Sequence, residues 1–305
     1  MSRGARRRQR QQPRTLQVFL IIVLVLLTVC VLVKAFFLKA PEQKAAELPA
    51  QSAASDTDSQ QSPEEQAAQE ALRSHLERKG GFYTILLSGL DDDNGGSDTN
   101  ILVAVDTVNG YVYGVSIPRD SKAIIDGKAR KINYAYNKGG TELLADTVSE
   151  QLGIPVDYTV SVNLKGFTAL VDAIGGVDFD VPINMDYDDP IQNLSIHFKK
   201  GVQHLSGADA LRVVRFRHNN DGSGYGSEDL GRMATQQKFL KAVAKKMLSA
   251  GNILTKIDDY AKIFNQYVDT NLTVGNLAWL GTEVLKMGVD KIDFSTLPNE
   301  WRSPY

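Results

Sequence analysis

The sequence predicts an α/β domain in which helices cover a β-sheet, preceded by one membrane-spanning segment. The domain is predicted because short apolar, β-branched runs alternate with helical patterns from about residue 82 onward. Such alternation is typical of a sheet packed against helices rather than of an all-β sandwich. The span is predicted because a long apolar run near the N-terminus follows a group of arginines with no acidic residue among them.

The apolar run from Val18 to Val33 contains no charged residue, and it extends to Leu38 if Lys34 directs its amine toward the headgroups. This length reaches the roughly 20 residues that cross a bilayer, and we assign the span to 16–38. A cleaved signal peptide is the nearest alternative. The length of the run and Pro41, which follows the most plausible cleavage point after Ala40, argue against it.

The basic tip, 1–15, predicts a cytoplasmic N-terminus and an extracytoplasmic domain, because basic residues beside a span stay inside the cell. The arginines in it are Arg3, Arg6, Arg7, Arg8, Arg10 and Arg14. Binding of nucleic acid by this arm is the weaker interpretation, since the arm adjoins an apolar span. The expected location is the cell membrane, as a single-pass protein.

Removing these six arginines from the formal charge of −2 leaves −8 for the remainder, so any anion site outside must be a local basic pocket. The single cysteine, Cys30, lies within the predicted span, which excludes an external disulfide, zinc knuckle or thiol nucleophile. Residues 39–80 are rich in Ala, Gln, Glu, Ser and Pro and predict a flexible extracytoplasmic stalk. The folded domain is expected over 81–305.

Strands are predicted where the chain is apolar and β-branched, and helices where apolar residues recur with helical spacing. The predicted strands are Phe82–Gly89, Ile101–Asp106, Tyr111–Ile117, Tyr158–Val162, Val177–Val181 and Lys291–Leu297. The predicted helices are Thr141–Leu152, Leu164–Ile174, Gly207–Val214, Glu228–Leu248, Ile253–Tyr267 and Val274–Met287. The dipeptide Asn109-Gly110 favours a tight hairpin, and Ser206 is a suitable N-cap.

Familiar catalytic motifs are missing from the sequence. It has no Gly-x-Ser-x-Gly elbow and no phosphate-binding loop that ends in Gly-Lys-Ser/Thr. The four histidines lack the spacing of metal ligands on a helix. The glycine-rich stretch from Gly222 to Ser227 follows no predicted strand, so we interpret it as a surface loop.

Two carboxylates stand where predicted strands end or begin. Asp91 follows the first strand and Asp98 precedes the second. Carboxylates at adjoining strand ends can share Mg²⁺, which also takes phosphate oxygens as ligands. An ordinary loop rich in Asp and Gly is the alternative.

Four arginines are further candidates for this site. Arg119 follows the third strand, and Arg215 and Arg217 flank Phe216, so that both would face one way in extended chain. Arg232 and Gln236 are four residues apart and share a helical face. Converging arginines would bind phosphate through paired, planar hydrogen bonds. The alternative is that Arg232 pairs with Asp229 and the others lie on the surface.

Together these residues resemble successive blocks of the LytR-CpsA-Psr family. The blocks are Gly89-Leu-Asp91, Ser97-Asp98-Thr99, Ser116-Ile-Pro-Arg119-Asp120, Lys131-Ile-Asn133-Tyr-Ala135, Asn163-Leu-Lys-Gly166-Phe167, Leu170 to Val177, Arg215-Phe-Arg217 and Asp229 to Gln237. They run in the family's order from about residue 82 to 240, and the ordered set is far more specific than any one block. The basic tip and the span also match the family's usual architecture.

The resemblance implies a three-layer α/β/α domain with a central mixed sheet, acting as an extracytoplasmic phosphotransferase. Its expected partners are a polyprenyl-pyrophosphate-linked glycopolymer, such as a teichoic acid or capsular polysaccharide, and peptidoglycan, joined through a phosphodiester. It implies Mg²⁺ at Asp91 and Asp98. The residues expected to bind pyrophosphate are Arg119, Lys131, Arg215, Arg217, Arg232 and Gln236, and those expected at the reaction centre are Asp98, Arg119 and Asp120. A pyrophosphatase and a non-enzymatic lipid-binding regulator are the alternatives.

Overall fold

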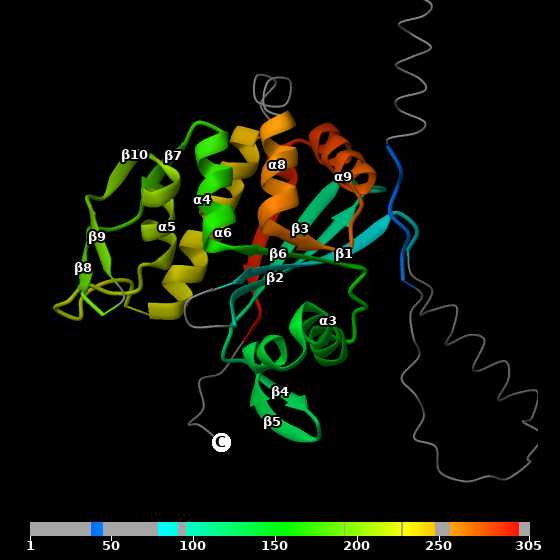
Figure 1. Ribbon diagram of the computed structural model, residues 1–305, viewed down its shortest axis with the longest axis horizontal. Coiled ribbons are helices and arrows are strands. Elements are labelled where there is room, and N and C mark those ends of the chain that lie inside the picture. The colour runs from blue at the N-terminus through cyan, green and yellow to red at the C-terminus, as the bar shows by residue number, and fades with distance from the viewer. Residues whose placement is uncertain are drawn as a thin grey trace, which may run out of the picture.

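The computed structural model describes residues 38–44, 79–90, 96–191, 193–226, 228–247 and 257–298. A six-stranded sheet has the order β11-β6-β1-β2-β3-β12 (Figure 1). Its strands are β1 (Phe82–Leu90), β2 (Ser97–Asp106), β3 (Tyr111–Ile117), β6 (Tyr158–Asn163), β11 (Val268–Thr270) and β12 (Ile292–Thr296). β1 pairs in parallel with β6, as β3 does with β12, and the other pairs are antiparallel. The sheet is therefore mixed, as predicted.

Helices cover both faces of this sheet. Successive side chains of a strand point to opposite faces, so Leu86 of β1 packs against α3 (Asn133–Leu152) while Tyr83 and Ile85 pack on the side of α9 (Val274–Met287). Burial on both faces explains why β1 is apolar almost throughout. The prediction of a sheet between two helical layers is confirmed for these elements.

A second group of elements packs beside the sheet and has its own apolar core. It consists of α4 (Leu164–Ala173), β7 (Val177–Val181), β8 (Met185–Asp189), β9 (Leu194–Phe198), β10 (Gly201–Leu205), α5 (Gly207–Arg215) and α6 (Glu228–Met247). The strand predicted at Val177–Val181 forms, but it pairs with β10 and not with the central sheet. β8 and β9 form a separate hairpin, and α8 (Ile257–Tyr267) packs on α4.

One glycine permits the close contact between α4 and α5. A Cβ on Gly207, at the start of α5, would lie 2.2 Å from the carbonyl oxygen of Thr168 in α4. That distance is shorter than real Cβ contacts, so any larger residue would push the two helices apart. The helices form part of the wall of the cavity described below.

The structure differs from the prediction in the unpredicted strands β8, β9 and β10 and in the region between β3 and α3. A hairpin of β4 (Lys122–Ile125) and β5 (Lys128–Lys131) forms where the sequence predicts no strand. The predicted helix at Thr141 begins earlier, at Asn133, because a first helical segment precedes a kink at Gly139 and Gly140. Gly140 has a φ of 66°, a conformation that favours glycine.

The described part of the predicted stalk contacts the domain. Asn276 of α9 donates a hydrogen bond to the Lys39 carbonyl (2.9 Å), and the amide of Lys44 donates to the buried carboxylate of Asp157 (2.7 Å). Gln43 donates to the carbonyl of Lys79 (3.0 Å), so the chain before and after 45–78 lies together. Residues 39–44 therefore belong to the folded body and are not a free tether; 45–78 lie outside the described residues.

The predicted membrane span, 16–38, lies outside the described residues except for Leu38. Of the helices that the structure describes, none has both the length and the apolar composition needed to cross a bilayer.

The turn between β2 and β3 is held by the buried carboxylate of Asp106. It accepts hydrogen bonds from the backbone amides of Val108 (3.1 Å) and Asn109 (2.9 Å) and from the amine of Lys79 (2.8 Å). Burial alone would raise the pKa of Asp106, but the hydrogen bonds from Lys79 and Asn109 outweigh it, and the pKa is lowered. The ionised carboxylate is therefore favoured by folding.

We expect Asp106→Asn to flatten the acid branch of the stability profile. A carboxylate with a lowered folded-state pKa stabilises the protein above about pH 4, where it is also ionised in the unfolded chain, and this contribution disappears as the pH falls through the folded-state pKa. Thermal unfolding between about pH 6 and about pH 2 measures the effect. Asp293→Asn, at a side chain that is 68% exposed, is the control and should follow the wild-type profile. Parallel profiles for wild type and Asp106→Asn would contradict this role.

Candidate active site

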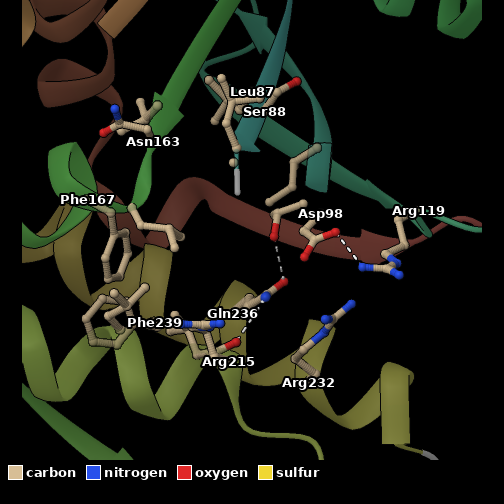
Figure 2. A pocket seen from close by; sticks show the side chains of 18 of the residues that line it. Leu87, Ser88, Asp98, Arg119, Asn163, Phe167, Arg215, Arg232, Gln236 and Phe239 are labelled. Atoms are coloured by element: carbon tan, nitrogen blue, oxygen red, sulfur yellow. Dashed lines mark hydrogen bonds and ion pairs between the residues drawn. The ribbon is translucent and has the colours of Figure 1, made fainter. Parts of the chain in front are cut away.

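A cavity of about 830 Å³ lies between the central sheet and the helices α4, α5 and α6. Its apolar lining includes Leu87, Val160, Phe167, Leu170, Val214 and Phe239. Its charged lining consists of Asp98, Arg119, Arg215, Arg217 and Arg232. Figure 2 shows Phe167 and Phe239 on one side and Asp98, Arg119 and Arg232 on the other. The cavity thus joins an apolar compartment to a cationic one.

Strand register brings Asp98 and Arg119 together. β2 and β3 pair as far as Asn100 and Ile117, so Asp98 and Arg119, each two residues beyond this pair, lie at the same end of the two strands. The Arg119 guanidinium contacts the Asp98 carboxylate at 2.5 Å, and both side chains are about one-third exposed. Among the lining residues that the structure describes, Asp98 is the one carboxylate, against four arginines.

A buried arginine on α6 lies on the opposite side of this compartment. Arg232 is 5% exposed and pairs with Asp229 one turn earlier, at 2.6 Å. Arg217 lies 4.0 Å from the same carboxylate. Burial, reinforced by repulsion from Arg217, lowers the pKa of Arg232, against the attraction of Asp229 and Asp98. Two arginines thus share one carboxylate, which leaves an excess of positive charge.

Arg232 also has a buried donor without a partner. Its Nε has no hydrogen-bond partner among the described residues. A buried donor left unsatisfied costs about 1–3 kcal/mol and more when it is charged, so a bound anion would recover this cost. Arg232 both pairs with Asp229 and lines the cavity, although the sequence analysis treated these two roles as alternatives.

The remaining predicted phosphate ligands come from the end of α5 and the middle of α6. Arg215 is the last residue of α5, Phe216 is extended and buried, and Arg217 follows. Gln236 shares the cavity face of α6 with Arg232, as predicted, and its amide donates to the carbonyl of Val214 at 3.1 Å. This hydrogen bond holds the end of α5 against α6.

Two predicted site residues lie outside the cavity lining, and the position of a third is not described. Asp120 and Lys131 are not in the cavity lining; they form an ion pair of 3.0 Å beside it. Asp120 also lies 3.7 Å from Arg119, so the pair adjoins the cationic compartment without entering it. Asp91 lies outside the described residues, and the described chain before it ends at Leu90, which pairs with Ser97 next to Asp98.

Several polar lining residues had no predicted role. Asn133 and Asn137 lie on the first segment of α3, before the kink, and Asn163 caps α4 by accepting from the amide of Gly166 at 2.8 Å. Asn133 and Asn163 belong to sequence blocks that resemble the family. That resemblance was the available indication that they have a role. Their approach to the cavity depends on the kink and on the cap, which spacing alone did not reveal.

The described donor set is compatible with Mg²⁺ but is incomplete. No group of three acidic, histidine or cysteine side chains that could hold a metal occurs in the part of the chain that the structure describes. Mg²⁺ commonly binds through one or two carboxylates and completes its shell with water and substrate phosphate. Asp98 can supply one such carboxylate ligand, and one of its oxygens also accepts a hydrogen bond from Arg119.

Comparison with known proteins identifies the family and several relatives of this chain. The family model described as LytR_cpsA_psr matches residues 46–303. The polyisoprenyl-teichoic acid–peptidoglycan teichoic acid transferase TagV of Bacillus subtilis is 37% identical over 202 residues, which is 63% of this chain and 50% of TagV. The corresponding transferase TagU of Bacillus cereus is 37% identical over 195 residues, which is 62% of this chain and 60% of TagU.

The fold is likewise similar to a solved relative. The crystal structure of B. subtilis TagV aligns with a TM-score of 0.61 at 34% identity, covering 73% of this chain and 87% of that one. The chain spans half to 60% of the length of the two curated relatives that it matches. Since the family model covers most of the sequence, the chain belongs to the LytR-CpsA-Psr family.

Proposed function

We propose that this protein transfers a glycopolymer from a polyprenyl-pyrophosphate carrier to peptidoglycan, forming a phosphodiester. The observation that supports this most is the junction of an apolar compartment with four converging arginines in one cavity. A polyprenyl tail needs an apolar compartment, and a pyrophosphate needs cationic side chains such as these arginines. The names of TagV and TagU, which specify transfer of teichoic acid from a polyisoprenyl carrier to peptidoglycan, agree with the proposal.

In the proposed reaction an acceptor hydroxyl attacks the phosphorus nearest the glycan. The new phosphorus–oxygen bond forms as the bond to the bridging oxygen breaks, and polyprenyl phosphate leaves with that oxygen. Phosphoryl transfer of this type depends on alignment and on stabilising charge that spreads over phosphate oxygens. Arg119, Arg217 and Arg232 would supply that stabilisation as fixed donors in a partly desolvated compartment.

We assign the metal and the proton to different carboxylates. Asp98, together with Asp91, would hold Mg²⁺, which neutralises phosphate charge when bound. Asp98 is then committed to the metal and to Arg119. This leaves Asp120, 3.7 Å from Arg119 and 41% exposed, to accept the proton of the entering hydroxyl.

We also propose that the span at 16–38 anchors the chain in the cell membrane with its N-terminus in the cytoplasm. The arginine-rich tip and the apolar run support this orientation. The contacts of Lys39 and Lys44 with the domain would then hold the catalytic domain close to the bilayer. A carrier lipid in the outer leaflet would be within reach of such a domain.

Incubating the purified full-length protein with lipid-linked polymer and peptidoglycan tests the proposal. We expect polymer bound to peptidoglycan through a phosphodiester, and chelation of divalent cations should lower the rate by at least about tenfold, because a catalytic metal supplies several kcal/mol of charge stabilisation. Release of polymer phosphate with no conjugate would instead indicate a pyrophosphatase. Binding of the lipid without any turnover would indicate a regulator.

A further inference from the structure

The outward side of helix α9 carries a stripe of residues without charge. An α-helix turns by about 100° per residue, so Val274, Ala278, Gly281 and Leu285 fall within an arc of about 60°. Val274 is 64% exposed, Leu285 is 40% exposed, and Ala278 is exposed as well. A Cβ on Gly281 would have no atom of another element within 4 Å. We call these four residues the apolar stripe of α9.

The polar and buried residues of α9 lie off this stripe. Glu283 and Lys286 are its two charged residues, and they pair with each other at 2.7 Å. The Glu283 side chain is 17% exposed and so belongs to the side that packs on the domain. Asn276 and Leu280 on that side are buried. The helix therefore presents an uncharged, largely apolar side outward, which is the pattern of a contact surface rather than of a solvated face.

The chain that follows the predicted membrane span is held against the start of this helix. Asn276, in the first turn of α9, donates its hydrogen bond to the carbonyl of Lys39, which is the first residue after the span assigned to 16–38. Figure 1 shows the segment 38–44 beside α9. An anchor that ends there would leave the bilayer next to Val274, at one end of the apolar stripe.

The cavity lies on the same face of the sheet that α9 covers. Side chains of a strand alternate, so Tyr83, Ile85 and Leu87 of β1 point to one face. Tyr83 and Ile85 pack in one core cluster with Leu280 of α9, and Leu87 lines the cavity. Val160 of β6 both borders that cluster and lines the cavity. A bilayer in contact with α9 would thus lie on the side of the sheet from which the apolar compartment extends.

A lipid surface fits the stripe better than a protein partner does. A stable protein–protein interface buries about 800 Å² of each partner, which is more than four side chains of one helix can offer. A bilayer next to the anchor needs no such area, because the tether keeps the two surfaces at a high local concentration. Apolar helical faces of this kind lie in the interface between headgroups and acyl chains.

We propose that the apolar stripe of α9 rests on the outer leaflet of the bilayer and turns the cavity side of the sheet toward the lipid. This inference rests on the proposed function, because the anchor at 16–38 supplies the tether. Docking fixes the orientation of a domain that a single span would leave free to rotate. The tail of the carrier can then pass from the leaflet into the apolar compartment with little exposure to water.

The test uses full-length Cys30→Ser protein in lipid vesicles, with Ala278→Cys labelled by the fluorophore NBD. The probe is a phospholipid with a doxyl quencher near the headgroup end of its acyl chain. We expect the label to lose about half of its emission, because a docked apolar face lies roughly 5–10 Å into the interface. The matched control is Val202→Cys, at a side chain that is 74% exposed on β10, on the opposite side of the molecule from 38–44 (Figure 1). Its label should lose no emission.

Flotation of the same vesicles separates this inference from the proposed anchor. If the chain floats with the vesicles and the label at Ala278 is not quenched, the docking is refuted and the anchor stands. A chain that does not float refutes both. Equal quenching at Ala278 and Val202 would also overturn the docking. So would a blue-shifted label that the doxyl lipid does not quench, which would indicate that a second copy or residues 45–78 cover the stripe.

Val274→Asp combined with Leu285→Asp should abolish the quenching at Ala278 and leave the chain in the vesicles, because the added carboxylates resist burial in the interface. With a polyprenyl donor embedded in the membrane this variant should lose about tenfold in kcat/KM, in line with the loss of two apolar contacts. A short-chain donor dissolved in water should react at the wild-type rate. Ile191→Asp combined with Val202→Asp, at exposed apolar positions elsewhere, should behave as the wild type with both donors.

The two donors distinguish docking from catalysis. Equal losses with the embedded and the dissolved donor would contradict a role at the bilayer. If the wild type transfers neither donor, the proposed reaction fails, and the quenching of the label at Ala278 still tests the docking.

Discussion

Replacing Arg119 with alanine is expected to lower the rate of transfer by about a hundredfold to a thousandfold. This is the usual effect of removing one fixed donor that stabilises charge in a transition state. Arg119 contributes more than its own charge, because its contact of 2.5 Å with Asp98 also orients the carboxylate proposed to hold Mg²⁺. The loss should therefore appear in kcat as well as in KM.

The thermal stability of Arg119→Ala should stay near that of the wild type. The side chain is 30% exposed, and partly exposed ion pairs contribute little to folding. Arg212→Ala is the matched control, because Arg212 forms a comparable ion pair with Asp209 (2.9 Å) and does not line the cavity. It should retain full transfer. Full activity in Arg119→Ala, measured in the same steady-state assay, would remove Arg119 from the proposed mechanism.

Phe239→Ala is expected to reduce the free energy of unfolding by about 3–5 kcal/mol, as is common when a buried phenylalanine is truncated. Phe239 is fully buried on α6, and its ring centre lies 5.8 Å from that of Phe167 and 5.3 Å from that of Phe179. The substitution removes contacts with α4 and β7 at once. A loss of this size is a large share of the total stability of a typical domain.

Denaturant titration of the full-length protein measures this loss from the shift of the unfolding midpoint. Ile191→Ala is the control, since Ile191 is 97% exposed and its removal should change the midpoint very little. The same truncation also widens the apolar compartment that Phe239 lines, so binding of a polyprenyl lipid should weaken. An unchanged midpoint would show that α6 does not depend on this ring for its packing.

Five of the six strands of the central sheet were predicted, because their apolar pattern is local, whereas the three-residue strand β11 was not. β3 has the predicted bounds, Tyr111–Ile117, and β12 lies within the strand predicted at Lys291–Leu297. The hairpin β4–β5 was missed because its strands are only four residues long and β5, Lys-Ala-Arg-Lys, contains no β-branched or aromatic residue. Its formation depends on burial of Ala123 and Ile125 against α3.

Parts of the site were also predictable from residue type and position. That Arg232 and Gln236 share a face follows from helical spacing, and both line the cavity. Spacing could not show that Asp120 and Lys131 pair with each other beside the cavity, because an ion pair depends on side-chain directions in three dimensions. It also could not show that Phe239 completes the apolar wall.

The sequence by itself determined the α/β class, the positions of the main strands and helices and the residues with phosphate chemistry, because these depend on periodicity and residue type. Only the tertiary structure decided which of these residues meet. Arg119 and Arg232 are separated by more than 100 residues of chain, yet the register of β2 with β3 and the packing of α6 bring both into one cavity. The same holds for β7, whose strand character is local but whose partner, β10, was selected by the core that both strands share with α5 and α6.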